Sequence, residues 1–422
     1  MLIQFSVRNY MSIRDEAILS LSAGSGKEHE ENIRIIENAG KKQIERVLPS
    51  VAIYGANAAG KSNLFKAMTA AILAVRNSNV RSDNTVIPGM IPFLLDEENR
   101  NKPVEFEFIF STEGHKYQYG FSADMNRIYD EYLYEYKSSR PSVVFERTNT
   151  NIYSFTETYK GKLNKFIKYN TENKLFLSTA TNWNSQLTRP AYNWLASGID
   201  TYNERSFDIS LNTLSPFDEA GDELNTFVRT LLRNADINIS DYDLEIEKTK
   251  GPVQLPPGIE ISPSVAFETK SYKVSTKHTV VTENGNTEYS LPLDAESEGT
   301  KKIFAFAPII KLALESGKTL VIDEIDNSLH PLLLEYIINL FNNANSNPNN
   351  AQLVFNTHAV EVLSLDYFRR DQIYFAEKDN DTGATELYSL DEFSPRKSEN
   401  IRKGYLLGRY GAVPNIGWED LN

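Results

Sequence analysis

Residues 55–62 are the stretch that most constrains how this chain can fold. They read GANAAGKS and lie between the apolar segment SVAIY and the helix-forming segment NLFKAMTAAILAV. This order of strand, glycine-rich loop and helix fits the phosphate-loop pattern G-x-x-x-x-G-K-[ST] at every fixed position. In such a loop, glycines let backbone N–H groups curl around phosphate oxygens, and the helix N-terminus adds partial positive charge. The sequence therefore predicts a site for a nucleoside triphosphate rather than a chance glycine-rich turn.

The residues of this loop have distinct expected roles. Lys61 is expected to reach the β- and γ-phosphates, and the Ser62 hydroxyl is expected to ligate Mg²⁺. ATP and Mg²⁺ are therefore the predicted cofactors. The predicted ATP-binding residues of this segment are Gly55, Ala56, Asn57, Ala58, Ala59, Gly60, Lys61, Ser62 and Asn63.

A second polar group follows the apolar run TLVI at residues 319–322. Asp323 comes directly after this predicted strand, with Glu324 beside it and Asp326 two positions later. A phosphate-loop enzyme needs a strand that ends in a carboxylate holding the Mg²⁺ shell, which is the role predicted for Asp323. Glu324 is then placed to polarise the attacking water as a general base. The alternative is a strand that ends in a solvated acidic turn, and the presence of the phosphate loop disfavours it.

A large part of the chain separates Ser62 from Asp323. This spacing resembles the ATP-binding-cassette, SMC and RecF class, in which inserted lobes divide one nucleotide-binding head. That class has a signature S-x-G that opens a helix before the metal-binding strand, and Ser297 and Gly299 in the segment SEGTKK fit it. The alternative is a plain helix cap, since Ser is a preferred N-cap residue.

His358 follows the apolar run QLVFN within the segment NTH. The same class uses a histidine at the end of this strand to contact the γ-phosphate. His358 is therefore a predicted catalytic residue, together with Lys61 and Glu324. The alternative is a structural or merely exposed histidine.

The remaining pattern predicts an α/β protein with insertions. Residues 104–155 alternate aromatic or β-branched residues with polar ones, as in VEFEFIFS, which predicts a meander of hairpins. Residues 159–235 have a helical pattern, and residues 250–264 form a Pro- and Gly-rich loop followed by short strands. After residue 296 helix and strand alternate, as in a parallel sheet. The expected parts are an N-terminal part of the ATPase head with the β-meander lobe (1–158), an inserted helical and β subdomain (159–290), and a C-terminal part of the head (291–422).

Composition limits the expected location and partners. The chain has no cysteine, which excludes disulfides and Cys-based sites and fits a reducing cytoplasm. No apolar stretch approaches the length of a membrane span and no secretory signal is evident, so a cytoplasmic location and no membrane partner are expected. The net charge of −13 means that nucleic acid would need a local basic patch. One such segment, 396–409, could contact nucleic acid or an acidic partner, unless it is a solvated helix face; its basic residues are Arg396, Lys397, Arg402, Lys403 and Arg409.

Six segments together resemble the stand-alone bacterial AAA-type ATPases of the ABC/SMC/RecF/OLD class: FSVRNYMSI, YGANAAGKSNL, ESEGTKK, VIDEIDNSLHP, VFNTH and GYLLGRYGAVPNI. The resemblance covers roughly residues 1–70 and 290–422. It implies a P-loop NTPase head of ABC-ATPase type with an inserted β-rich lobe and a helical insertion. It also implies a homodimer or higher oligomer formed through the heads.

Many members of this family act in antiphage or abortive-infection defence, as in AbiL-, PARIS- and Septu-like systems. There the ATPase works with a separately encoded effector that is nuclease- or toxin-like, which makes such a protein an implied partner here. The resemblance further implies that Asn327, Ser328 and His330 form a loop that faces a second subunit.

Two other polar features have simpler interpretations. Asp379 and Asp381 are expected to belong to a hairpin with the turn NDTG rather than to a metal site. Gln118 is expected to be a strand residue rather than the glutamine that the class places beside the metal.

Three functions are compatible with these features. The first is an Mg²⁺-dependent ATPase that dimerises head-to-head around ATP and controls an effector in antiphage defence. The second is a RecF-like DNA-repair clamp, which the net charge of −13 disfavours. The third is an ATP-bound scaffold without hydrolysis, which Glu324 disfavours because such a scaffold has no need of a general base.

Overall fold

The structure is a computed structural model that describes residues 1–38, 43–138, 140–203, 206, 215, 217, 221–235, 238–251, 267–283 and 285–414. The chain divides into two compact units. The first unit contains Met1–Tyr202, Ala313–Ile325 and Glu335–Asn422, and the second contains Asn203–Leu312 and Asp326–Leu334. The first unit thus includes residues 159–202, and the three-part division expected above stays a prediction.

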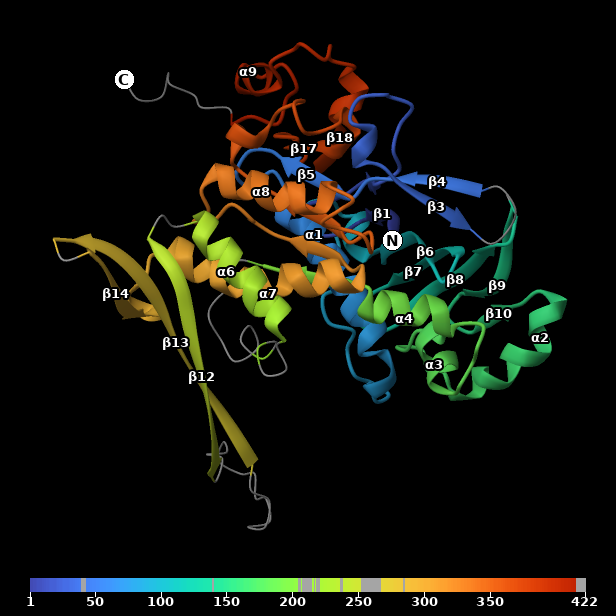
Figure 1. Cartoon of the computed structure of the whole chain (residues 1–422). Coiled ribbons are helices and arrows are strands. Elements are labelled where there is room, and N and C mark those ends of the chain that lie inside the picture. The colour runs from blue at the N-terminus through green and yellow to red at the C-terminus, as the bar shows by residue number, and fades with distance from the viewer. Residues whose placement is uncertain are drawn as a thin grey trace. The chain divides into compact units, whose positions relative to one another are not determined.

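A six-stranded sheet in the first unit carries the phosphate loop, in the order β11-β15-β16-β5-β17-β18. Figure 1 labels β5, β17 and β18 of this sheet. Parallel pairs join β11 to β15, β15 to β16, β16 to β5 and β5 to β17, whereas β18 is antiparallel to β17. Every residue of β5, β15 and β16 is buried, as strands covered on both faces should be. The strands are β5 (Ser50–Tyr54), β11 (Ile199–Tyr202), β15 (Thr319–Ile322), β16 (Gln352–Asn356), β17 (Ile373–Lys378) and β18 (Thr385–Ser389).

Helices follow or precede these parallel strands in the chain, and this alternation confirms the predicted α/β class. The helix α7 precedes β15, and α8 connects β15 to β16, as expected for the segment after residue 296. Because parallel strands end at the same edge of a sheet, the residues that follow β5, β15 and β16 meet there. The helices around this sheet in the sequence are α1 (Lys61–Arg76), α7 (Glu298–Ser316), α8 (Pro331–Asn342) and α9 (Ile401–Leu406).

The first unit also contains a seven-stranded antiparallel sheet, which confirms the predicted meander. Its order is β10-β9-β8-β7-β6-β1-β2, so consecutive hairpins lie side by side. Alternate aromatic residues of β6 and β7, such as Phe108 and Tyr119, are fully buried and pair across the two strands. The strands are β1 (Leu2–Arg8), β2 (Ala17–Ser20), β6 (Val104–Thr112), β7 (His115–Ala123), β8 (Ile128–Tyr136), β9 (Pro141–Thr148) and β10 (Ile152–Ser154); β3 (Arg34–Asn38) and β4 (Gln43–Val47) form a separate hairpin.

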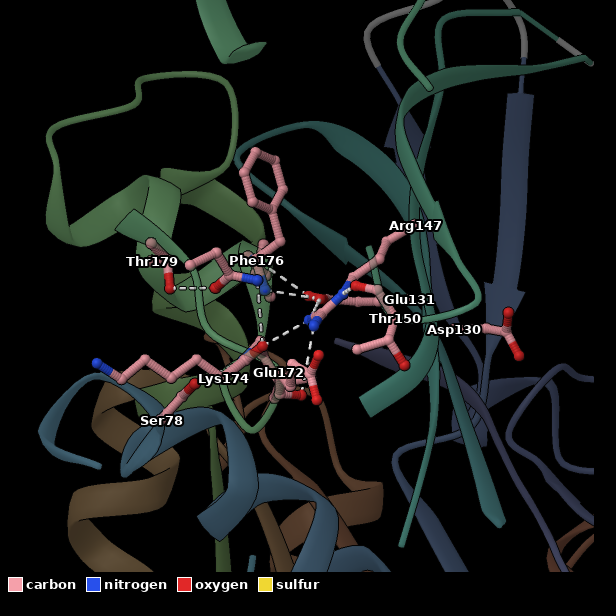
Figure 2. Close-up of polar contacts among 12 residues, drawn as sticks. Ser78, Asp130, Glu131, Arg147, Thr150, Glu172, Lys174, Phe176 and Thr179 are labelled. Atoms are coloured by element: carbon pink, nitrogen blue, oxygen red, sulfur yellow. Dashed lines mark hydrogen bonds and ion pairs between the residues drawn. The ribbon is translucent and has the colours of Figure 1, made fainter. Parts of the chain in front are cut away.

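A buried polar network joins this antiparallel sheet to the helix α3 (Phe176–Asn182). Figure 2 shows Glu131 of β8 and Arg147 of β9 at its centre. Glu131 accepts hydrogen bonds from the backbone N–H groups of Phe176 (2.6 Å) and Leu177 (2.9 Å), and its carboxylate lies 3.7 Å from the Arg147 guanidinium. Arg147 also donates to the carbonyl of Lys174 (2.6 Å). The two charged groups are therefore satisfied inside the fold.

The segment predicted to be helical contains one strand that the pattern did not reveal. Helices are present at α2 (Glu157–Leu163), α3 and α4 (Arg189–Ser197), but Ile199–Tyr202 form the strand β11. This strand pairs with β15 along its whole length. A run of four residues is too short to show a period, and its partner lies far away in the sequence.

The second unit contains α6 (Asp222–Ala235) and a three-stranded antiparallel sheet in the order β12-β13-β14. The strands β12 (Ile239–Gly251) and β13 (Phe267–Thr282) form a long ribbon in Figure 1, and β14 spans Gly285–Pro292. The prediction of short strands after residue 264 was wrong for β13, because this strand pairs first with β12 and then with β14. Most of the predicted loop at 250–264 lies outside the described residues.

Three aromatic rings pack together in the core of the second unit. The Phe217 and Phe304 rings stack at 5.2 Å, and Tyr242 meets Phe304 edge-on at the same distance. None of the helices in the described ranges is both long and apolar enough to cross a bilayer.

Candidate nucleotide-binding site

The phosphate loop needs glycine at two positions for steric reasons. Gly55 and Gly60 have φ values of 155° and 102°. A Cβ atom at Gly55 would lie 2.3 Å from the Ala376 carbonyl oxygen, and one at Gly60 would lie 2.1 Å from Thr385 Oγ1. Neither position could hold a side chain without displacing a neighbouring strand. The fixed glycines of the sequence pattern therefore also set how closely the loop packs against β17 and β18.

Lys61 begins α1 and its ammonium group lies against the loop. Lys61 Nζ donates to the carbonyl oxygens of Gly55 (2.7 Å) and Ala56 (3.0 Å), and the side chain is buried. Asn57 and Ala58, at the tip of the loop, are exposed. The loop thus combines a lysine charge, a helix N-terminus and backbone groups in the arrangement that binds phosphate.

The hydroxyl groups of Ser12 and Thr385 form hydrogen bonds beside the phosphate loop, and the sequence reasoning missed them. Thr385 Oγ1 hydrogen-bonds with Ser12 Oγ (2.8 Å) and with the Ala59 carbonyl oxygen (2.9 Å). Asn63 Nδ2 donates to the same Ser12 oxygen (2.7 Å). Ser12 and Thr385 lie at opposite ends of the sequence, so no local pattern could have placed them together.

Ser62 and Asp323, the two predicted magnesium ligands, lie beside each other. Ser62 Oγ donates to Asp323 Oδ1 over 3.0 Å. Neighbouring ligands of an octahedral Mg²⁺ ion, at about 2.1 Å from it, lie roughly 3 Å apart. The spacing of the two oxygens therefore fits one shared ion, with phosphate oxygens and water completing its shell. Both side chains are half-buried, which leaves room for these further ligands.

Glu324 lies at the same edge of the sheet in an unusual backbone conformation. Its φ is 55°, in the left-handed region that L-residues seldom adopt. Its backbone N–H donates to Asn356 Oδ1 over 2.6 Å, and Asn356 Nδ2 donates to Asp323 Oδ1. Asn356 is a further residue that the sequence reasoning missed, although it lies in the segment NTH that drew attention to His358. His358 itself is exposed just beyond the end of β16.

The predicted signature residues belong to the second unit. Ser297 Oγ lies 2.9 Å from Thr300 Oγ1 and accepts a hydrogen bond from Thr300 N (3.2 Å). This is the helix cap that the simpler interpretation expects, and a cap does not prevent a second role. A Cβ at Gly299 would lie 2.8 Å from the Ser328 carbonyl oxygen, and Lys302 Nζ donates to the Asn327 carbonyl (2.9 Å). The start of α7 therefore packs closely on the loop predicted to face a second subunit.

His330 of that loop has a local structural role at the start of α8. His330 is exposed, and its Nδ1 accepts a hydrogen bond from Leu332 N over 3.3 Å. Its carbonyl oxygen accepts from Leu333 N over 2.9 Å. His330 thus caps the helix, whether or not it meets another subunit.

Two further sequence interpretations can be compared with the structure. Asp379 accepts from Thr382 N (2.7 Å) in the turn between β17 and β18, as the hairpin interpretation predicts. In the basic segment 396–409, Arg402 lies 3.7 Å from Glu361, and Arg409 forms an ion pair with Glu399. Part of its positive charge is therefore balanced within the chain. A contact with nucleic acid through this segment stays a prediction.

Comparison with known proteins gives the family. A family model described as "AAA domain, putative AbiEii toxin, Type IV TA system" matches residues 50–364, which is most of the chain. The chain belongs to this AAA-domain family. The match begins at β5 and includes the phosphate loop, Asp323, Glu324 and His358. It confirms the predicted AAA-type ATPase class and the P-loop fold of this AAA-domain protein.

Two solved structures are similar to this AAA-domain protein. One is a crystal structure of the Smc head bound to the C-winged helix domain of ScpA, with a TM-score of 0.39 and 12% identity, covering 92% of this chain and 97% of that one. The other is the Smc head domain with an extended coiled coil bound to the C-terminal domain of ScpA from Pyrococcus furiosus, with a TM-score of 0.40 and 12% identity, covering 97% and 98%. No curated protein sequence matches the chain.

Proposed function

We propose that this protein is an Mg²⁺-dependent ATPase that dimerises head-to-head around ATP. The observation that carries the proposal is the shared edge of the parallel sheet, where Ser62 Oγ lies 3.0 Å from Asp323 and Lys61 lies against the phosphate loop. Glu324 follows Asp323 directly, so a general base is next to the predicted metal ligand. This order of groups is what phosphoryl transfer to water requires.

The chemistry proposed for these residues is as follows. Backbone N–H groups of the loop and Lys61 bind the β- and γ-phosphates. Ser62 and Asp323 would hold Mg²⁺, which would supply positive charge beside these phosphates. The oxygen of a water molecule forms a bond to the γ-phosphorus, and the bond from that phosphorus to the β,γ-bridging oxygen breaks. Glu324 accepts the proton of the water, and the products are ADP and phosphate. His358 contacts the γ-phosphate as charge moves toward the leaving oxygen.

The second part of the proposal is that each site is shared by two subunits. Ser297 and Gly299 would cover the nucleotide held by the partner's phosphate loop, so an isolated subunit would bind ATP but hydrolyse it slowly. The close approach of Gly299 to the Ser328 carbonyl supports this idea, because the predicted signature and the predicted subunit-facing loop are then neighbours within the second unit.

A mixing experiment tests the shared site. Glu324→Gln removes the base and should trap ATP-bound dimers, whereas Ser297→Arg should block closure with ATP binding intact. Mixed before ATP is added, the two inactive variants should recover about a quarter of wild-type activity, because half of random dimers are mixed and each has one intact site. This value assumes that the two sites act independently.

Two controls accompany the mixture. Because Ser297 caps α7, Ser297→Ala should lose the same cap, worth about 1 kcal/mol, without blocking closure. Mixed dimers are demonstrated by co-purification of differently tagged subunits. Normal hydrolysis by Ser297→Arg alone would contradict the shared site, and so would absence of recovery in proven mixed dimers.

The biological role proposed is control of a separately encoded effector in antiphage, abortive-infection defence. Support comes from the family description, which names an AbiEii toxin and a type IV toxin–antitoxin system. Co-purification from the native locus should yield a stable complex with a nuclease- or toxin-like protein. Full protection against phage by this chain expressed alone would contradict the proposal.

A further inference from the structure

One buried side-chain amide at the end of β16 contacts the Asp323 carboxylate and the backbone of Glu324. Asn356 Nδ2 donates to Asp323 Oδ1, and Asn356 Oδ1 accepts from Glu324 N over 2.6 Å. The exposed fraction of Asn356 is 0%. Because a backbone N–H can only donate, the amide oxygen must face Glu324 and the amide nitrogen must face Asp323. The orientation of the amide is therefore determined by its partners.

Each of these two contacts has a specific consequence. The donor to Asp323 occupies Oδ1, the oxygen that also accepts from Ser62, and it adds no charge of its own. Asp323 therefore keeps its negative charge for a cation while its rotamer is held. The acceptor for Glu324 N stabilises a backbone with φ of 55°, a conformation that determines the direction of the Glu324 side chain.

The position of Asn356 explains why one side chain can do both. β16 lies between β15 and β5, so its last residue is next to the strand that carries Asp323 and next to the strand that leads into the phosphate loop. The backbone of Asn356 adds a third contact, since its carbonyl accepts from Ile325 N over 3.3 Å. Asn356 thus contacts all three residues from Asp323 to Ile325.

We infer that Asn356 is a positioning residue that couples magnesium binding to nucleotide binding and aims the general base. This inference rests on the proposed ATPase function and deepens it. The residue touches neither phosphate nor water in this scheme; it acts through Asp323 and Glu324. Partners of metal ligands in other proteins act in the same way, by fixing the ligand's orientation.

The test compares Asn356→Leu with a matched buried asparagine. Asn347 is also 0% exposed, donates to the carbonyls of Phe341 and Ala351 (both 2.8 Å), and accepts from Ala351 N (2.7 Å), but it precedes β16. Calorimetry with a non-hydrolysable ATP analogue measures affinity in EDTA and in Mg²⁺, and the ratio of the two affinities reports the coupling. Thermal unfolding of each variant is measured alongside.

The expected results separate positioning from general stability. Asn356→Leu should reduce the coupling ratio by about 10–100-fold, the usual effect of losing a partner of a metal ligand. Its affinity in EDTA should stay near the wild-type value because Lys61 and the loop are unchanged, and kcat should fall more than KM rises. Asn347→Leu should lower thermal stability and leave the coupling ratio unchanged.

A variant in which the two residues are exchanged distinguishes a loss of coupling from simple misfolding. In Asp323→Asn/Asn356→Asp the new amide can donate to the new carboxylate, whose other oxygen can accept from Glu324 N. This variant should regain the thermal stability of wild type without regaining the coupling. Full coupling in the exchanged protein would overturn the inference, as would an unchanged ratio in Asn356→Leu or an equal loss in Asn347→Leu. If wild type fails to bind the analogue, the proposed function is wrong and the inference fails with it.

Discussion

Two carboxylates in the first unit show how differently the fold uses the same chemical group. Glu131 is 0% exposed and lies among Arg147, the Tyr119 hydroxyl (3.1 Å) and two backbone N–H groups. Asp323 is half-buried and is held by the Ser62 hydroxyl and the Asn356 amide, both of them neutral. The charge of Glu131 is matched inside the protein, whereas the side-chain donors that hold Asp323 are neutral and do not balance its charge.

The difference teaches how to separate structural acids from functional ones. A buried charge is expensive unless a counter-charge and hydrogen bonds accompany it, and Glu131 has both. Burial still raises the pKa of Glu131 above its ordinary value, even beside Arg147. The return is geometric: the carboxylate fixes the first residues of α3 against β8 (Figure 2). Asp323 instead lies at the edge of the parallel sheet, where the proposed ligand would bind.

The largest expected effect comes from removing Glu131 from the buried polar network that it forms with Arg147. Glu131→Leu leaves the Arg147 charge without its counter-charge and the N–H groups of Phe176 and Leu177 without their acceptor, so the free energy of unfolding should fall by about 3–5 kcal/mol. Urea denaturation measures it. The matched control is Asp130→Leu, because Asp130 is the exposed neighbour on the same strand, and it should cost about 1 kcal/mol or less. Equal losses of unfolding free energy in the two variants would contradict the prediction that the buried contacts of Glu131 stabilise the fold.

The next largest effect is expected at the candidate nucleotide-binding site. Lys61→Ala removes the cation proposed to bind the β- and γ-phosphates, and ATP affinity should fall by about a hundredfold or more, equivalent to roughly 3 kcal/mol. Calorimetry measures the affinity. Lys66→Ala, an exposed lysine on the same helix, is the control and should bind normally. Unchanged affinity in Lys61→Ala would refute the nucleotide site.

A smaller effect should follow from loosening the support behind the phosphate loop. Thr385→Val keeps the shape but removes the hydroxyl that contacts Ser12 and the Ala59 carbonyl, so ATP affinity should fall by several-fold, equivalent to about 1 kcal/mol. The control is Thr382→Val, which changes an exposed hydroxyl in the same hairpin. If the two variants bind ATP equally well, the loop does not depend on this support.

The smallest expected effect is a change with pH in the stability that Glu131 contributes to the fold. Because burial raises the pKa of Glu131, the folded state holds its proton more tightly than the unfolded chain does. Its contribution to stability is therefore greatest below the ordinary glutamate pKa and is lost as pH rises through the folded value. Relative to Glu131→Gln, which does not titrate, wild type should gain stability as the pH is lowered through that range. Urea denaturation across the acidic range measures this difference, and a constant difference would contradict the shift.

Much of the fold could be predicted because its signals are local. The glycines and Lys61 lie within one loop, the alternation of buried and exposed residues follows each strand of the meander, and Asp323 directly follows an apolar strand. These patterns depend on the geometry of single elements, which repeats every two residues in a strand and every three to four in a helix. Where the element was too short, as in β11, the pattern was uninformative.

The phosphate loop, the acids at the end of β15 and the class of the fold can be predicted from the order of the residues alone. The other polar contacts depend on how the chain folds: Asn356 lies between Asp323 and Glu324, Ser12 and Thr385 lie beside the loop, and Arg147 lies beside Glu131. An asparagine or threonine has the same local signature whether it is solvated or buried. Its role depends on the partner that a distant strand brings within hydrogen-bonding distance, because the energy of a buried polar group is set by that partner.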